Sequence, residues 1–179
     1  MNAQEFATIA SAVKAAYPNA NIMPDKQSKN VWYTMLSDLD YNVCLTAIKE
    51  HMSINKFAPS ISEIRQKCSE IVNGLPKDWG AAWAEVLDSI RYKGMYREEE
   101  ALKEMEPLTR ECVKRLGYQN ICLTENLEMD RANFRMIYEQ VSKQRMQDAQ
   151  LPIGLQTKKQ ELRMLSSQVV AALEMGESE

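Results

Sequence analysis

The chain has 179 residues, with 22 Lys and Arg against 25 Asp and Glu, and a formal net charge of −3. This balance argues against a protein whose main task is to grip nucleic-acid phosphates, because such proteins carry a strongly basic face. No stretch approaches about 18 apolar residues and the N-terminus lacks the regions of a signal peptide, so we expect a cytoplasmic protein without a membrane span.

The first 73 residues carry the patterns of four short helices. Apolar residues recur at helical spacing over residues 3–17, and Pro18 ends that helix. Polar residues suited to N-capping precede the other three helices, and the last of them forms an S-x-x-E capping box. These capping positions are Asp25, Asp40 and Ser60, the last with Glu63. We therefore predict a compact N-terminal four-helix domain over residues 1–73.

The core of this domain should combine large apolar residues from several helices. The expected inward residues of the fourth helix are Ile61, Ile64, Cys68 and Ile71. The residues expected to pack together and hold the domain are Trp32, Leu36, Ile48 and Ile64. A domain this small depends on such a cluster for most of its stability.

A break at Gly74-Leu75-Pro76 introduces a second helical domain, which we predict over residues 76–149. Its first helix follows Asp78, carries one apolar stripe and closes at Gly94. The stripe consists of Trp79, Trp83, Val86 and Ile90. The further predicted helices are a short acidic one over 97–105, one from Pro107 to Gly117, and a long one from Asn126 to Asp148.

The last segment, residues 150–179, begins with a linker, QLPIGLQ, and continues as an amphipathic helix over 157–173. Such a helix either docks back on the body of the protein or lays its apolar face in the groove of a partner. The candidate partner-binding residues are those of its apolar stripe, Leu162, Leu165, Val169 and Leu173. Because β-branched residues never alternate over a useful length, the expected fold class is all-α.

No catalytic or cofactor-binding pattern is present in the sequence. The GxxxxGK[ST], GxGxxG and HExxH motifs are absent, and four widely spaced cysteines with one histidine do not fit a zinc site. Cys44 and His51 would lie about 10 Å apart along one helix, too far for direct proton transfer, which favours core packing. The acidic run at 98–100 points in different directions around a helix, which favours a solvated face over a metal site. We expect no enzyme, no cofactor and no metal.

Two basic clusters are candidate contacts for nucleic acid. One is formed by Arg110, Lys114 and Arg115, and the other by Arg131 and Arg135. Acidic residues accompany both clusters, so surface ion pairs are the favoured interpretation.

The N-terminal third contains two distinctive segments, AAYPNANI and VWYTMLSDLDYNVCLTAIKEHMSINKFAPSISEIRQ. Their distinguishing features are Tyr17-Pro18 after the first helix, Trp32 and Leu36 in the second, Asp40-Tyr41 at the start of the third, and Phe57-x-Pro59 before Ile61 and Glu63-Ile64. In these features, residues 1–72 resemble the replicative-helicase loader and inhibitor family of phages that infect Gram-positive bacteria.

The resemblance implies an ATP-free protein that binds a DnaB-type hexameric helicase of the phage or the host. Such a protein holds the helicase inactive and hands it to an origin-bound replisome organiser. In short members of the family, the N-terminal domain is folded, and the flexible C-terminal part contributes to helicase binding. This chain departs from that pattern, because residues 76–149 insert a helical segment before the tail.

Two further functions stay open. One is a helical DNA-binding phage protein, such as a replisome organiser or a regulator, which the acidic balance disfavours. The other is an antagonist of the host helicase loader, which the sequence does not separate from a helicase-binding protein. We expect neither strong direct binding to nucleic acid nor association with a membrane.

Overall fold

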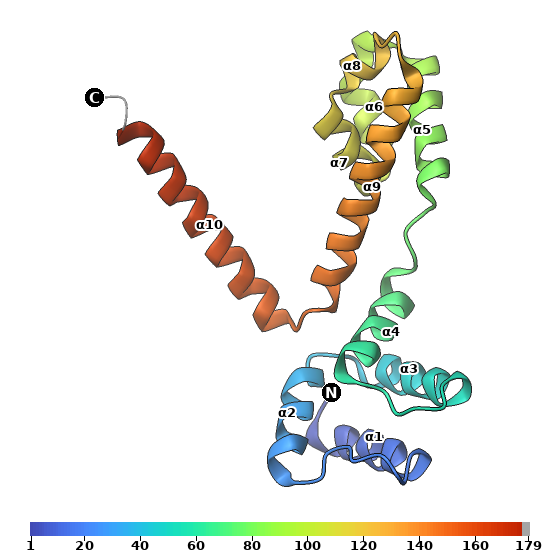
Figure 1. The fold of residues 1–179 in the computed structure, drawn as a ribbon, viewed down its shortest axis with the longest axis vertical. Helices are drawn as coiled ribbons and strands as arrows, with labels where there is room; N and C mark the ends of the chain where they lie inside the picture. Colours follow the sequence, from blue (N-terminus) through green and yellow to red (C-terminus); the bar gives the residue numbers. More distant parts are fainter. Residues whose placement is uncertain (177–179) are drawn as a thin grey trace. The chain divides into compact units, whose positions relative to one another are not determined.

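The computed structural model describes the backbone of residues 1–176 and the side chains of residues 1–166. Every regular element in these residues is a helix (Figure 1), which confirms the predicted all-α fold class. The chain divides into two compact units. Unit 1 joins residues 1–74 to the segment that begins at Asp148, and unit 2 is the continuous segment 75–147. Unit 1 is therefore built from two stretches of chain that are distant in sequence.

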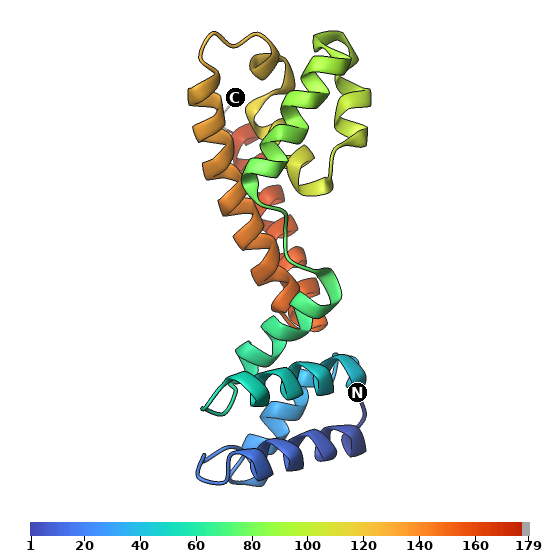
Figure 2. The ribbon, with the colours of Figure 1, turned by 90° about the vertical axis from the view of Figure 1, so that its right-hand side faces the viewer.

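Unit 1 contains the four N-terminal helices, drawn in blue to green in Figure 2. They are α1 (Ala3–Ala16), α2 (Lys26–Leu36), α3 (Tyr41–Ile54) and α4 (Ile61–Asn73). The predicted caps are confirmed, since Asp25, Asp40 and Ser60 accept hydrogen bonds from first-turn backbone N–H groups. Glu63 completes its capping box by accepting a 2.7 Å hydrogen bond from the Ser60 backbone N–H. Local side chains therefore fix where these helices begin.

The core of unit 1 contains the residues predicted for it. Three of the four are at most 2% exposed, namely Leu36, Ile48 and Ile64. Trp32 packs against this cluster but stays partly exposed. The prediction that Ile71 faces inward is wrong, because its side chain is 39% exposed. Cys68 is the last α4 residue in the core cluster, so the final turn of α4 extends beyond it.

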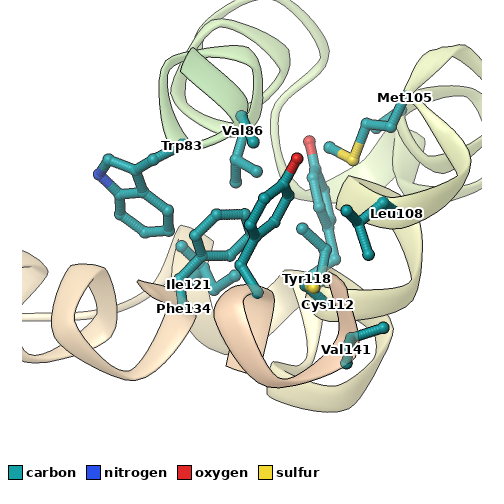
Figure 3. Packing of buried hydrophobic residues seen from close by; sticks show 13 residues of the cluster. Trp83, Val86, Met105, Leu108, Cys112, Tyr118, Ile121, Phe134 and Val141 are labelled. Carbon is teal, nitrogen blue, oxygen red and sulfur yellow. The ribbon is translucent and has the colours of Figure 1, made fainter. Parts of the chain in front are cut away.

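Unit 2 is a second helical body with a core of its own (Figure 3). Its elements are α5 (Trp79–Lys93), the 3-10 helix η1 (Met95–Arg97), α6 (Glu98–Glu104), α7 (Pro107–Leu116), α8 (Tyr118–Cys122) and α9 (Leu127–Gln150), whose last residues belong to unit 1. The predicted apolar stripe of α5 is confirmed, since all four residues belong to the core cluster or pack against it. The sequence pattern does not predict α8, because a five-residue helix is too short to show a period.

Aromatic side chains from α5 and α9 meet in the core of unit 2. The Phe134 ring centroid lies 5.1 Å from that of Trp83 and 5.6 Å from that of Tyr138. The Tyr138 hydroxyl donates a 3.1 Å hydrogen bond to the Lys77 backbone carbonyl. This hydrogen bond gives the buried phenol a partner, so the ring packs inside the core without leaving its polar end unsatisfied.

The tail helix α10 (Ile153–Gly176) begins earlier than predicted. Only Leu151 and Pro152 separate it from α9, so the break is shorter than the expected linker QLPIGLQ. The Pro152 carbonyl accepts a 2.8 Å hydrogen bond from the Leu155 N–H, which starts the helix directly after the proline. Gly154 suggests a loop in the sequence, but the first turn of α10 accommodates it, and a Cβ there would meet nothing within 4 Å.

The fully buried position of Leu36 predicts that Leu36→Ala lowers the free energy of unfolding of unit 1 by about 2–5 kcal/mol, because a cavity replaces the lost side chain. Val31 lies on the same helix but is 53% exposed. Val31→Ala is therefore the matched control and should change stability by less than about 0.5 kcal/mol. Hydrogen exchange of peptides from α1–α4 during denaturation measures both, and equal effects would contradict the assigned core.

Candidate partner-binding site

The described residues contain no group of His, Cys, Asp and Glu arranged to hold a metal ion. Among the described helices, none has the length and apolar character needed to cross a bilayer. Burial raises the pKa of the Cys112 thiol to about 11, so this group stays protonated near neutral pH and is a poor nucleophile.

Cys44 and His51 are both buried residues of unit 1, which confirms core packing as their role. His51 Nε2 lies 3.0 Å from the Phe57 carbonyl oxygen, and Nδ1 lies 3.2 Å from the Asn55 side-chain nitrogen. Both ring nitrogens are thus engaged by the turn between α3 and α4. The histidine organises this turn rather than activating a thiol.

The charged clusters of unit 2 form ion pairs on its surface. Lys93 Nζ lies 2.7 Å from a Glu104 carboxylate oxygen and 3.8 Å from one of Glu100. Arg115 forms a 2.7 Å pair with Glu111 one turn away on α7. In the acidic run, Glu99 and Glu100 are exposed and Glu100 is ion-paired, as expected for a solvated face.

The second basic cluster is engaged in a similar way. The guanidinium carbons of Arg131 and Arg135 lie 5.4 Å and 5.0 Å from the centre of the Trp79 ring. Arg135 also pairs with Glu139 at 2.8 Å. Cation–π and ion-pair contacts thus account for these arginines without a nucleic-acid partner.

An open apolar groove runs along the first turns of α10. It is lined by Leu151, Leu155, Lys158, Lys159, Leu162, Arg163 and Ser166. Leu162 of the predicted stripe lies in this groove, and both Leu162 and Leu165 are 58% exposed. Val169 and Leu173 lie in α10, but their side chains fall outside the described part of the chain. A row of exposed leucines flanked by basic side chains is the best candidate for a partner-binding surface.

The apolar stripe of α10 begins before Leu162, its first predicted member. Leu155 precedes Leu162 by seven residues, which is about two helical turns, and Val169 follows after the same interval. Interpreting QLPIGLQ as a linker conceals the first member of this repeat. The seven-residue spacing is the signal that identifies it.

Contacts between the end of α9 and the start of α10 hold the base of the groove. Lys159 Nζ lies 2.5 Å from Asp148 Oδ1, and Arg163 lies 3.8 Å from the same carboxylate. The Gln156 side-chain amide donates a 2.8 Å hydrogen bond to the Leu151 carbonyl. These contacts define the groove before any partner binds.

Arg65 on α4 links the N-terminal helices to this junction. Its side chain is 5% exposed and binds both carboxylate oxygens of Asp38, with Nη1 at 2.7 Å and Nη2 at 2.9 Å. Nη1 also donates to the Met35 carbonyl at 2.6 Å, and Nε donates to the Gln150 carbonyl. Asp38 accepts a further 3.1 Å hydrogen bond from the Ile153 N–H. One ion pair therefore contacts both sides of the α9–α10 break.

The surroundings of Asp38 favour its charged form. Burial alone would raise its pKa, but hydrogen bonds from Arg65 and the Ile153 N–H outweigh burial and hold the pKa below the ordinary value of 3.8. A carboxyl whose pKa is lowered on folding contributes stability above its unfolded pKa and loses it as the pH falls through the folded pKa. The ion pair is thus fully formed near neutral pH.

The sequence pattern does not single out Arg65 and Asp38. The available signal is the position of Arg65 between Ile64 and Cys68 on the apolar face of α4, because a charge on such a face requires a buried partner. The identity of that partner depends on contacts across the chain, which no local pattern encodes.

The N-terminal part of unit 1 has a known counterpart. Residues 1–65 match the N-terminal domain of the gp39 family of phage helicase loaders and inhibitors. The first 65 residues thus form a gp39-type domain. The match covers α1 to α3 and the start of α4, and its last residue is Arg65. No curated protein and no solved structure matches the chain.

This match confirms the resemblance of the N-terminal third to phage helicase loaders and inhibitors. Residues 66–179, which include unit 2 and the groove on α10, lie outside the matched region.

The exposure of Leu162 in the groove and of Leu165 beside it on α10 predicts that both contribute little to the stability of the free protein. The substitutions Leu162→Ala and Leu165→Ala should each change the free energy of unfolding by less than about 0.5 kcal/mol, because little apolar surface is buried there. Thermal unfolding of each variant measures this change, with Leu36→Ala as the destabilised reference. A loss as large as that of the reference would show that the stripe packs against the body.

Proposed function

We propose that this protein is a phage DNA-replication adaptor that binds a DnaB-type replicative helicase, restrains it and delivers it to the origin complex. The gp39-type domain carries this proposal, because its family comprises helicase loaders and inhibitors. The partner is the helicase of the phage or the host, and an origin-bound replisome organiser receives it. The site of action is the cytoplasm of the host cell.

In this proposal the protein acts by binding alone, without enzymatic activity and without a cofactor. Two observations support this part of the proposal: Cys44 and His51 are buried, and Glu100 of the acidic run is paired with Lys93 and Arg97. The potentially reactive side chains therefore have structural partners. Energy for helicase movement comes from the helicase's own ATPase.

The α10 groove is the contact surface that we assign to the helicase. Its leucines offer apolar area to a partner, and Lys158 flanks them with positive charge, while Lys159 is paired with Asp148. A helicase element with apolar residues at helical spacing and carboxylates along its edge fits this surface. The apolar contacts supply affinity, and the charges favour one orientation.

A DNA-binding protein is the weaker alternative, because the net charge is −3 and because Arg115 and Arg135 of the two basic clusters are engaged by acids and by Trp79. A pull-down from infected-cell lysate with the purified chain as bait separates the candidates. Recovery of the helicase supports the proposal. Recovery of the host helicase loader alone indicates an antagonist of that loader, and a gel shift at physiological salt tests DNA binding.

We expect the purified protein neither to bind nor to hydrolyse ATP, and to lower the ATPase rate of a DnaB-type helicase when the two are mixed. Phosphate release from the helicase, the adaptor and the mixture measures both effects. An unchanged helicase rate at saturating adaptor would contradict restraint. ATP hydrolysis that copurifies with the chain and disappears on mutation would contradict the proposal that the protein has no enzymatic activity.

A carboxylate in the α10 groove should disrupt helicase binding. We expect Leu162→Glu to weaken affinity at least tenfold, or about 1.4 kcal/mol, because a charge would be buried against apolar surface. Met164 is 63% exposed and lies two residues, or about 200°, further around α10. Met164→Glu is therefore the matched control, and calorimetry should find its affinity unchanged. Equal losses for both variants would point away from the groove.

A further inference from the structure

The break between α9 and α10 brings two helix ends together, and each end carries backbone groups that the helix itself cannot satisfy. The last carbonyl groups of α9 and the first N–H groups of α10 have no partner within their own helices. Pro152 in the break has no N–H to offer. The Gln150 carbonyl and the Ile153 N–H are instead bound by side chains of the N-terminal helices, those of Arg65 and Asp38.

The charges of these two side chains match the helix ends that they contact. The C-terminus of a helix carries partial negative charge and its N-terminus partial positive charge. Arg65 binds the C-terminal end of α9 and also the Met35 carbonyl near the end of α2, while Asp38 binds the N-terminal end of α10. An uncharged pair, or one of reversed sign, would not complement all of these ends.

Backbone groups rather than apolar burial hold the start of α10 in this place. The Ile153 side chain is 61% exposed, so its contact with Asp38 runs through the backbone N–H. Neither Arg65 nor Asp38 lines the α10 groove. The two residues thus set where the groove begins without contributing to its surface.

We propose that Arg65 and Asp38 form an intramolecular docking site that caps the α9–α10 break and positions α10 on the gp39-type domain. They are positioning residues, because they act on the groove through the backbone of Gln150 and Ile153. The proposal rests on the proposed function only in taking the groove as the helicase-binding surface. Docking makes α10 part of unit 1, so any protein bound in the groove is held at a fixed place relative to that domain.

The substitution Ile153→Pro removes the single hydrogen bond from α10 to Asp38. Proline is well tolerated at the first position of a helix, so α10 itself should persist. Ile153→Ala is the matched control, because it removes the same exposed side chain but keeps the N–H donor. Circular dichroism of both variants checks that their helix content equals that of the parent.

Spin labels at Lys49→Cys on α3 and Gln160→Cys on α10 report the position of α10. Both positions are exposed, whereas Cys44, Cys68 and Cys112 are buried, and Cys122→Ser removes the half-buried thiol. Pulsed electron resonance on the full-length chain should give one narrow distance distribution for the parent and for Ile153→Ala. Ile153→Pro should lose the narrow peak.

Asp38→Asn gives a second test from the other side of the contact. It keeps the shape and an acceptor oxygen but removes the charge that pairs with Arg65, so it too should broaden the distribution. A broad distribution in the parent, or a narrow peak that survives both Ile153→Pro and Asp38→Asn, would overturn the docking site. Because no helicase is present in the measurement, its outcome is independent of whether the proposed function is correct.

Discussion

The arrangement of unit 1 depends on the ion pair and hydrogen bonds made by the buried guanidinium group of Arg65. An arginine that is 5% exposed needs a complete set of acceptors, since an unpaired buried charge costs several kcal/mol. Asp38 supplies two acceptors and the backbone supplies the others, at Met35 and Gln150. Met35 and Asp38 lie at the end of α2 and in the turn that follows it, and Gln150 ends α9. One side chain on α4 therefore requires two stretches that are distant in sequence to be in place together.

In unit 1, polar and apolar groups have different roles at the start of α10. Polar contacts inside the unit fix the start of α10, and the groove leucines beyond it stay exposed. A protein that must both hold a partner and release it gains from this arrangement. The start of α10 is held by polar contacts, so the apolar surface of the groove stays available for a partner.

Local signals in the sequence predict the N-terminal helices well. Asp25, Asp40 and Ser60 cap the helices that follow them because capping needs only neighbours within one turn. The apolar stripe of α5 also depends only on spacing within one helix, and its residues lie in the core of unit 2 or pack against it.

Features that depend on tertiary context escape prediction. Ile71 continues the apolar period of α4 beyond the point where anything covers it. The sequence pattern places the start of α10 too late because proline and glycine usually mark a loop, whereas here they stand at a helix start. The candidate site is only half predictable: the exposed leucines follow a helical period, but the partners of Arg65 lie up to 85 positions away in the sequence.

The discontinuity of unit 1 has a consequence for how the chain assembles during its synthesis. At about 5–20 residues per second, the 85 positions between Arg65 and Gln150 take about 4–17 s to translate. Unit 2 is one continuous segment and contains its own core, so it can fold within that interval. The order of the chain therefore makes the residues that complete unit 1, from Asp148 onward, the last to be synthesised, after the gp39-type domain and the whole of unit 2.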